Sequence, residues 1–187
     1  VIWTSTNARL VKNENGDTSY FEGFLTDITE RKGAEKKLER QVKALTVLHA
    51  TSVAGTQSDT EDEIISRVTK LTASIYTEVC GVLLLNDQGN ILTPHSSCVG
   101  PNINNWRDGY PITEGITGRA VLSGKSIRVD DISKDAHYIE IASGIKSELC
   151  VPFLVQNRII GVFDVENSQV NAFDEEDERL LNTIASG

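Results

Sequence analysis

The chain has 187 residues, of which 39% are hydrophobic, and carries a formal net charge of −9 with an isoelectric point near 4.8. This length accommodates one domain of ~100–150 residues together with an appendage. The acidic balance excludes a nucleic-acid-binding surface, because such a surface needs clustered Lys and Arg to neutralise phosphates. No apolar run approaches the ~20 residues that span a bilayer, and no signal peptide opens the chain. We therefore expect a soluble, cytoplasmic piece, whose parent protein can still be anchored elsewhere.

The cysteines are Cys80, Cys98 and Cys150, an odd number without C-x-x-C spacing. This pattern indicates neither a disulfide framework nor a zinc site. We expect reduced thiols and no metal site.

The N-terminal part changes from a strand pattern to a helical pattern within a few residues. Residues 3–24 contain Val, Thr, Tyr and Phe around an Asn-Gly-type turn at residues 13–17, which predicts a β-hairpin. Asp27 or Thr29 can cap the helix that follows. Because a lone hairpin is marginally stable in water, we expect it to lean on that helix, to pair with another chain or to be poorly ordered.

The join between hairpin and helix carries a recognisable segment. Residues 27–32, Asp-Ile-Thr-Glu-Arg-Lys, resemble the signature that closes PAS sensor domains and leads into a signalling helix. The resemblance covers only the final two strands of a PAS fold, and the chain opens without a start methionine. We therefore expect residues 1–29 to be the C-terminal strands of a PAS domain within a longer protein.

Residues 30–54 predict a linker helix whose apolar positions recur at steps of three to five and form one stripe. Read as heptads, Leu38 and Leu45 occupy one core position, and Gln41 and Leu48 occupy the other. That seam suits a short parallel coiled coil and hence a parallel homodimer. Packing of the stripe against its own domain is an equal alternative.

Residues 55–187 predict an α+β fold, with helices before and after a mostly antiparallel sheet. The expected elements, in chain order, are a helix capped by Ser58 or Asp59, a central strand over 79–85, a strand over 91–93, a loop over 98–112, a short helix over 114–122, a strand over 127–129, a crossing segment over 130–144, a hairpin over 147–154 and 158–165, and a helix from Asp174.

Five segments of this part resemble GAF domains in their order and spacing: residues 114–118, 129–132, 145–152, 159–167 and 172–177. The resemblance covers about residues 55–187 and implies a cavity between the sheet and the crossing segment, suited to a small organic molecule. The residues that we expect to line it are Ser97, Cys98, Trp106, Tyr110, His137, Tyr138, Ser147, Cys150 and Phe163.

The cyclic-nucleotide-binding branch of this family carries Asn-Lys, then Phe, then Asp-Glu. This chain has Asn167, Phe173, Asp177 and Glu178 at those places, but Ser168 replaces the lysine. The Lys–Asp ion pair that the pattern implies cannot form, so we expect no cyclic nucleotide.

Other cofactors of the family find little support. Bilin attachment is disfavoured because His137 lies between Ala136 and Tyr138 rather than beside a cysteine. Haem would need an axial ligand such as His95 or His137, but the histidines follow no pattern. We assign no cofactor.

An enzymatic branch of the family, the free methionine sulfoxide reductases, uses thiolates for attack and resolution. The positions of its reactive cysteines correspond here to Thr117 and Ile141, which cannot act as thiols. No other recognised set of nucleophile and base, paired carboxylates or metal ligands is evident. We therefore expect that the piece is not an enzyme.

The prediction is a sensory, small-molecule-binding module of a prokaryotic signal-transduction protein. It comprises residues 1–29 as PAS strands, 30–54 as linker helix and 55–187 as GAF domain, with neighbouring PAS and kinase or other output domains. A sensor histidine kinase of a two-component system is the expected parent protein. The alternatives are a ligand-free dimerisation module and a free methionine sulfoxide reductase-like enzyme.

Overall fold

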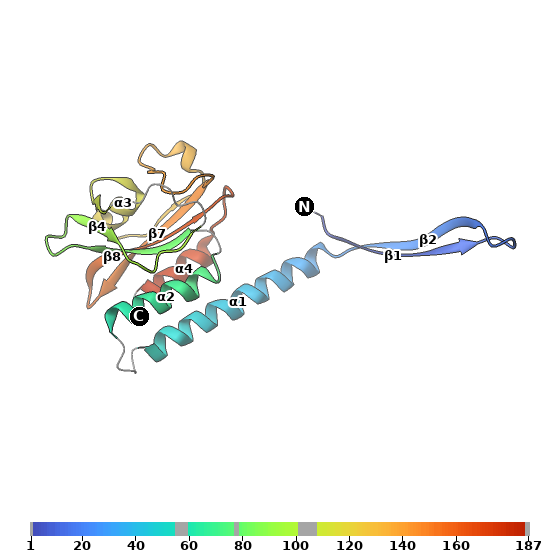
Figure 1. The fold of residues 1–187 in the computed structure, drawn as a ribbon, viewed down its shortest axis with the longest axis horizontal. Coiled ribbons are helices and arrows are strands. Elements are labelled where there is room, and N and C mark those ends of the chain that lie inside the picture. The colour runs from blue at the N-terminus through green and yellow to red at the C-terminus, as the bar shows by residue number, and fades with distance from the viewer. Residues whose placement is uncertain (1, 55–59, 77–78, 101–107, 186–187) are drawn as a thin grey trace. The chain divides into compact units, whose positions relative to one another are not determined.

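The computed structural model describes residues 2–54, 60–76, 79–100 and 108–185. The chain divides into two compact units, Val1–Val42 and Lys43–Gly187, with the boundary inside the first helix (Figure 1).

The first unit contains the predicted β-hairpin, which the structure confirms. Strands β1 (Thr4–Lys12) and β2 (Thr18–Asp27) pair antiparallel. The side-chain oxygen of Asn13 accepts hydrogen bonds from the backbone N–H groups of Asn15 and Asp17, and Gly16 has a φ of +85°. These contacts explain the turn, since Asn can bond its own following backbone and Gly adopts positive φ without strain.

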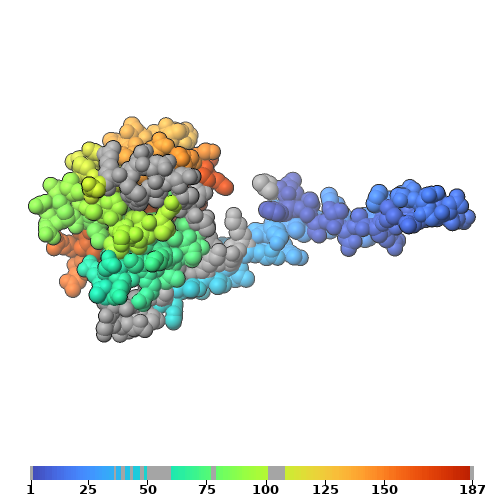
Figure 2. Space-filling view, viewed as in Figure 1, coloured from blue at the N-terminus to red at the C-terminus, as the bar shows by residue number. Residues whose placement is uncertain are grey.

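Nearly every residue of the two strands is exposed, and the face of the hairpin seen in Figure 2 is not covered by the rest of its own unit. Phe21, Phe24 and Leu25 are each more than 70% exposed. A sheet of only two strands with aromatic residues exposed buries little apolar surface, so its stability has to come from groups outside the hairpin.

Helix α1 (Thr29–Ala54) follows the hairpin directly. The Asp27 carboxylate accepts a hydrogen bond from the Thr29 N–H at 2.8 Å, and the Thr29 hydroxyl accepts one from the Trp3 N–H at 2.9 Å. Both residues that were expected at the cap therefore hold this helix end and tie it to the start of the hairpin.

The residues expected at a dimer seam lie on α1. Leu38 and Leu45 are 62% and 66% exposed, and Gln41 is exposed as well. The side chain of Leu48 lies outside the described residues. The parallel dimer stays a prediction.

The second unit is built on a six-stranded antiparallel sheet with the strand order β5-β4-β3-β8-β7-β6. The strand β3, which the sequence placed at the centre, lies between β4 and β8. The bounds of the strands are Val79–Leu85 (β3), Ile91–Pro94 (β4), Tyr110–Pro111 (β5), Ile127–Val129 (β6), Ser147–Val155 (β7) and Arg158–Asn167 (β8).

Helices cover both faces of this sheet, as Figure 1 shows. Helices α2 (Glu61–Ala73) and α4 (Glu175–Ala185) pack on one face, where Phe163 of β8 lies at the core. Helix α3 (Gly115–Ser123) and the short helix η1 (Ile132–Lys134) belong to the other face. The predicted α+β fold is confirmed.

The cap of α2 differs from the expected one. Ser58 and Asp59 lie outside the described residues, and Thr60 is the N-cap. The Thr60 hydroxyl accepts a hydrogen bond from the Glu63 N–H, and the Glu63 carboxylate accepts one from the Thr60 N–H at 2.8 Å. This reciprocal capping box satisfies two backbone N–H groups at once. It requires the N-cap residue to stand three positions before Glu63, and neither Ser58 nor Asp59 does.

The β7–β8 hairpin sets the two faces of the sheet. Its turn residues Gln156 and Asn157 have φ values of 50° and 62°, the left-handed pair that a two-residue hairpin loop requires. The register then shifts by one residue between Phe153 and Leu154, and beyond this shift Cys150 lies opposite Asp164. Because side chains alternate along a strand, Leu149, Val151, Phe163 and Val165 face α2 and α4, whereas Glu148, Cys150, Asp164 and Glu166 face the side of α3. No helix in the described part of the chain is long and apolar enough to cross a bilayer.

Replacement of Gly161 by Ala should destabilise the second unit by about 1–3 kcal/mol, because a Cβ there would collide with the backbone carbonyl of Leu83 in the neighbouring strand. Urea unfolding of the variant measures the change. The matched control is Gly33→Ala on α1, where a Cβ meets no atom within 4 Å. The control should leave the transition of the second unit unchanged; an equal effect of both would contradict this packing.

Candidate functional site

Three carboxylates lie on the α3 side of β7 and β8 and form what we call the acidic wall: Glu148, Asp164 and Glu166. They are only 3%, 4% and 2% exposed. Glu148 lies directly opposite Glu166, and Cys150 lies opposite Asp164 in the next cross-strand pair on the same face of the sheet. The hairpin register thus brings four polar side chains together in the interior of the domain.

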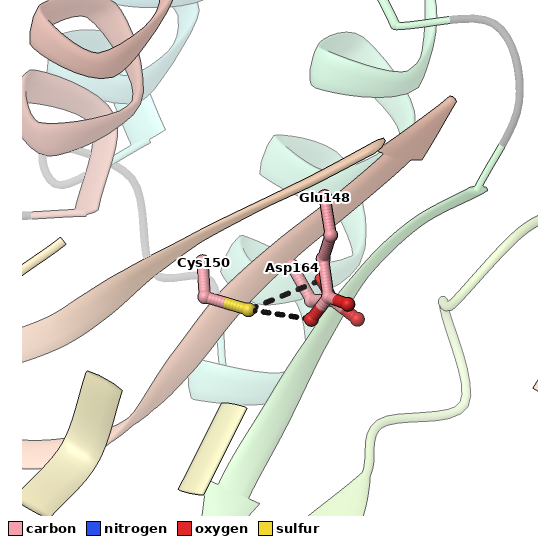
Figure 3. A group of neighbouring side chains, drawn as sticks. All are labelled: Glu148, Cys150 and Asp164. Atoms are coloured by element: carbon pink, nitrogen blue, oxygen red, sulfur yellow. Dashed lines mark hydrogen bonds between the residues drawn. The ribbon is translucent and has the colours of Figure 1, made fainter. Parts of the chain in front are cut away.

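The thiol of Cys150 contacts two members of the wall, as Figure 3 shows. Its Sγ lies 2.9 Å from Glu148 Oε1 and 3.4 Å from Asp164 Oδ1. The residue is fully buried. Cys150 can therefore donate its single proton to a carboxylate of the wall.

The acidic wall faces a cavity of about 30 Å³. The remaining lining is mostly apolar and comes from β3, β5, the start of α3 and the crossing segment: Leu83, Tyr110, Gly115, Ile116, Thr117, Ile139 and Ile141. A concave, mainly apolar space with a few convergent polar groups is the usual form of a small-molecule site.

The opposite side of the cavity is the N-terminus of α3. Gly115, Ile116 and Thr117 are its first residues, and Glu114 at the N-cap position makes no side-chain capping bond. The first backbone N–H groups of a helix have no partner inside the helix and carry partial positive charge. The cavity therefore has a carboxylate-rich side and a side with backbone N–H donors.

Burial dominates the electrostatics of the wall. It raises the pKa of Asp164 to about 7, and burial together with the charges of Asp164 and Glu148 raises the pKa of Glu166 as well. Burial and then Asp164 raise the pKa of Glu148. Burial and then Glu148 raise the pKa of the Cys150 thiol. The wall thus favours protons or another cation over bare negative charge.

Two buried polar atoms beside the wall lack hydrogen-bond partners in the described part of the chain. They are Glu166 Oε2 and the Tyr138 hydroxyl. A buried acceptor without a partner costs about 1–3 kcal/mol, and more when the group is charged. An unsatisfied carboxylate oxygen in a cavity wall indicates that the site completes its hydrogen bonds with a ligand.

Three of the expected lining residues lie in or near this cavity. Tyr110 lines it, and Cys150 contacts the wall. Tyr138 packs against the core on the α3 side. The structure brings these three toward one site.

Other expected lining residues lie elsewhere. Phe163 belongs to the core under α2 and α4, since alternation along β8 directs it away from Asp164 and Glu166. The Ser147 hydroxyl donates to the backbone carbonyl of Gln169 at 2.7 Å. His137 is exposed, and Trp106 lies outside the described residues.

Ser97 and Cys98 are held at the end of β4. The Ser97 hydroxyl lies 2.8 Å from His95 Nδ1, and His95 Nε2 lies 2.8 Å from an Asp62 carboxylate oxygen. The Cys98 thiol donates to the Val82 carbonyl. These bonds account for the polar groups of all three residues, including His95, which was weighed as a haem ligand.

The acidic wall itself was missed as a site. The signal was present: Glu148, Asp164 and Glu166 are charged residues at alternate positions of otherwise apolar strands. A carboxylate on the inward face of a buried strand is rare unless it is paired or functional.

With no cation bound, the free energy of unfolding should fall as the pH rises from about 4 to 8. The carboxylates have higher pKa values in the folded state than in the unfolded state, so the folded state binds more protons, and that stabilisation is lost as they ionise. Asp164→Asn should flatten this profile, as measured by urea unfolding across that pH range. The exposed control Asp87→Asn should not, and an unchanged slope in Asp164→Asn would contradict the account.

Comparison with known proteins identifies the family to which the chain is similar. The family model described as GAF domain matches residues 58–187. GAF domain-containing protein A of Dictyostelium discoideum is 40% identical over 70 residues, which cover 37% of this chain and 44% of that protein. The matched region thus spans less than half of this relative.

Two similar proteins are named enzymes. Free methionine-R-sulfoxide reductase of Escherichia coli (strain K12) is 27% identical over 152 residues, covering 80% of this chain and 82% of that enzyme. The X-ray structure of free methionine-R-sulfoxide reductase from Neisseria meningitidis, in complex with its substrate, has the same fold, with a TM-score of 0.69, 22% identity and coverage of 79% and 86%. The expectation that the piece is not an enzyme was wrong, because enzymes resemble it over most of its length. The matching family model spans more than half of the chain, which therefore belongs to the GAF domain family.

Proposed function

We propose that this GAF domain binds a small free amino acid in the cavity between the sheet and α3, with free methionine sulfoxide as the first compound to test. The observation that carries the proposal is Glu166, which lines the cavity and whose buried Oε2 has no hydrogen-bond partner among the described residues. The named relatives supply the compound, since the E. coli protein and the N. meningitidis structure are both free methionine-R-sulfoxide reductases.

The cavity matches the charges of a zwitterion. An ammonium group beside Glu166 satisfies the free oxygen and offsets the charge of the acidic wall. A carboxylate at the other end meets the backbone N–H groups of Ile116 and Thr117 at the start of α3. The apolar side chains of Leu83 and Ile141 suit a short aliphatic chain between the two ends.

Ligand entry requires the cavity to widen. Its volume of about 30 Å³ is far below the roughly 300–1,000 Å³ of typical small-molecule pockets. Ile139 and Ile141 close one side, on a segment between η1 and β7 that contains no helix or paired strand. Displacement of this segment enlarges the cavity while the sheet keeps its hydrogen bonds.

Turnover of the bound sulfoxide is the enzymatic form of the proposal, favoured by the reductase that covers 80% of the chain. Thr117 and Ile141, at the positions expected for reactive thiols, line the cavity without a thiol. Reduction would therefore draw on another thiol. Assay of methionine formed from methionine sulfoxide with dithiothreitol as reductant measures it directly.

Glu166→Gln should weaken binding of free methionine sulfoxide about tenfold or more, because a hydrogen bond to a charged group contributes about 1.5–3 kcal/mol. Isothermal titration calorimetry measures the dissociation constant. The matched control is Glu175→Gln on α4, an exposed carboxylate on the other side of the sheet, which should bind like the wild type. Wild-type protein that binds neither methionine sulfoxide nor methionine contradicts the proposal and favours a ligand-free dimerisation module.

The second part of the proposal concerns the larger protein in which this domain acts. We infer a cytoplasmic sensory module, in which residues 1–29 end a PAS domain and α1 passes ligand occupancy to an output domain such as a histidine kinase. The Asp-Ile-Thr-Glu-Arg-Lys segment at 27–32 and the exposed stripe of Leu38, Val42 and Leu45 support this reading. Pairing of two α1 helices along that stripe would bury it.

The double substitution Leu38→Glu with Leu45→Glu should convert a parallel dimer into monomers, because it places like charges at the helix seam. Sedimentation velocity at several protein concentrations reports the mass. Thr46→Glu, outside the heptad core positions, is the control and should stay dimeric. A wild-type chain that sediments as a monomer at all concentrations would exclude the pairing.

A further inference from the structure

We propose that Glu148, Cys150 and Asp164 form a binding site for a divalent metal ion of the zinc type. The site adjoins the cavity that we assign to the amino acid, but it does not depend on that assignment. We expected no metal site from the sequence, because the donors come from two strands and share no C-x-x-C spacing.

The donor atoms are already close together. One oxygen of each carboxylate and the Cys150 sulfur lie within 4.8 Å of one another, with Sγ 2.9 Å from Glu148 Oε1 and 3.4 Å from Asp164 Oδ1 (Figure 3). Metal–oxygen bonds of about 2.0–2.2 Å and a metal–sulfur bond of about 2.3 Å place tetrahedral donors some 3.3–3.8 Å apart. Shifts of a fraction of an ångström to about one ångström per side chain therefore complete the coordination.

Burial makes this set different from an exposed acidic cluster. Glu148 and Asp164 are 3% and 4% exposed, and Cys150 is fully buried. In the described part of the chain no Lys or Arg forms an ion pair with either carboxylate. Arg119, whose charge acts on Glu148, pairs with Asp135 instead. A dication offsets two of the three negative charges that the two carboxylates and the thiolate carry.

A second feature points independently to a missing ligand. Glu166 lies directly opposite Glu148 across the strand pair, is 2% exposed and keeps Oε2 without a partner. It lines the same cavity as Glu148 and Asp164, so a group bound to the metal at its open position can hydrogen-bond to Glu166. Three protein ligands with an open fourth position are the arrangement of zinc sites that meet small molecules.

The donor types select the metal. Magnesium and calcium take oxygen ligands, and a thiolate is a poor ligand for either. Zinc accepts cysteine sulfur together with carboxylate oxygen. The Cys150 proton leaves when the metal binds, because only the thiolate coordinates, so the bound ion keeps this thiol deprotonated despite its burial.

The test is titration of the chelator-treated full chain with Co²⁺, which reports thiolate ligation through a sulfur-to-cobalt absorption band in the near ultraviolet. The wild type should develop this band with one equivalent, and Zn²⁺ should abolish it by displacement. Cys150→Ser should lose the band. The matched control Cys98→Ser should keep it, because that thiol bonds the Val82 carbonyl instead.

Zinc X-ray absorption of the wild type makes the test independent of variant folding. The expected result is one sulfur at about 2.3 Å with oxygen ligands at about 2.0–2.2 Å. A shell of only nitrogen and oxygen, no cobalt–thiolate band in the wild type, or a band that survives in folded Cys150→Ser would overturn the proposal. Methionine sulfoxide binding is measured separately in the chelator-treated protein, so failure of the metal site and failure of the amino-acid site are distinguishable.

Discussion

The register of the β7–β8 hairpin is the constraint on which the domain depends. The left-handed turn at Gln156 and Asn157, together with the one-residue register shift between Phe153 and Leu154, places Cys150 opposite Asp164 and Glu148 opposite Glu166. A slip of one residue would turn the carboxylates toward the core under α2 and α4 and expose Phe163 on the cavity side. The same pairing therefore builds the apolar core and collects the polar groups of the site.

Collecting three carboxylates and a thiol in the interior is unfavourable unless positive charge accompanies them. A buried network of this kind opposes folding when it is bare and stabilises the domain when a cation is bound, which couples occupancy to stability. The backbone N–H groups at the start of α3 lie across the cavity and complement the wall. Charge of both signs around a small apolar space favours a zwitterionic ligand over a neutral one.

Much of the fold follows from local patterns. The apolar run of β3, the turns of both hairpins and the alternation along β7 and β8 predicted the sheet, and the spaced motifs predicted the family. The cap at Thr60 was missed because Ser58 and Asp59 also fit the rules for a helix start.

The site was harder to predict from the sequence, because Glu148, Asp164 and Glu166 come together only when the strand register places them on one face of the sheet. Phe163 was misplaced for the same reason: its neighbours in sequence face the cavity and it does not. An enzyme was ruled out from the sequence because Thr117 and Ile141 occupy the positions of the reactive cysteines. The carboxylates of the acidic wall were not considered in that prediction.

A crystal structure of the domain grown with free methionine sulfoxide tests the central claim most directly. The account predicts the ligand between the acidic wall and the start of α3, with its ammonium nitrogen within hydrogen-bonding distance of Glu166 Oε2 and Ile141 displaced from its position in the free protein. An empty cavity at saturating ligand concentration, or a ligand with its carboxylate against Glu166, would contradict it.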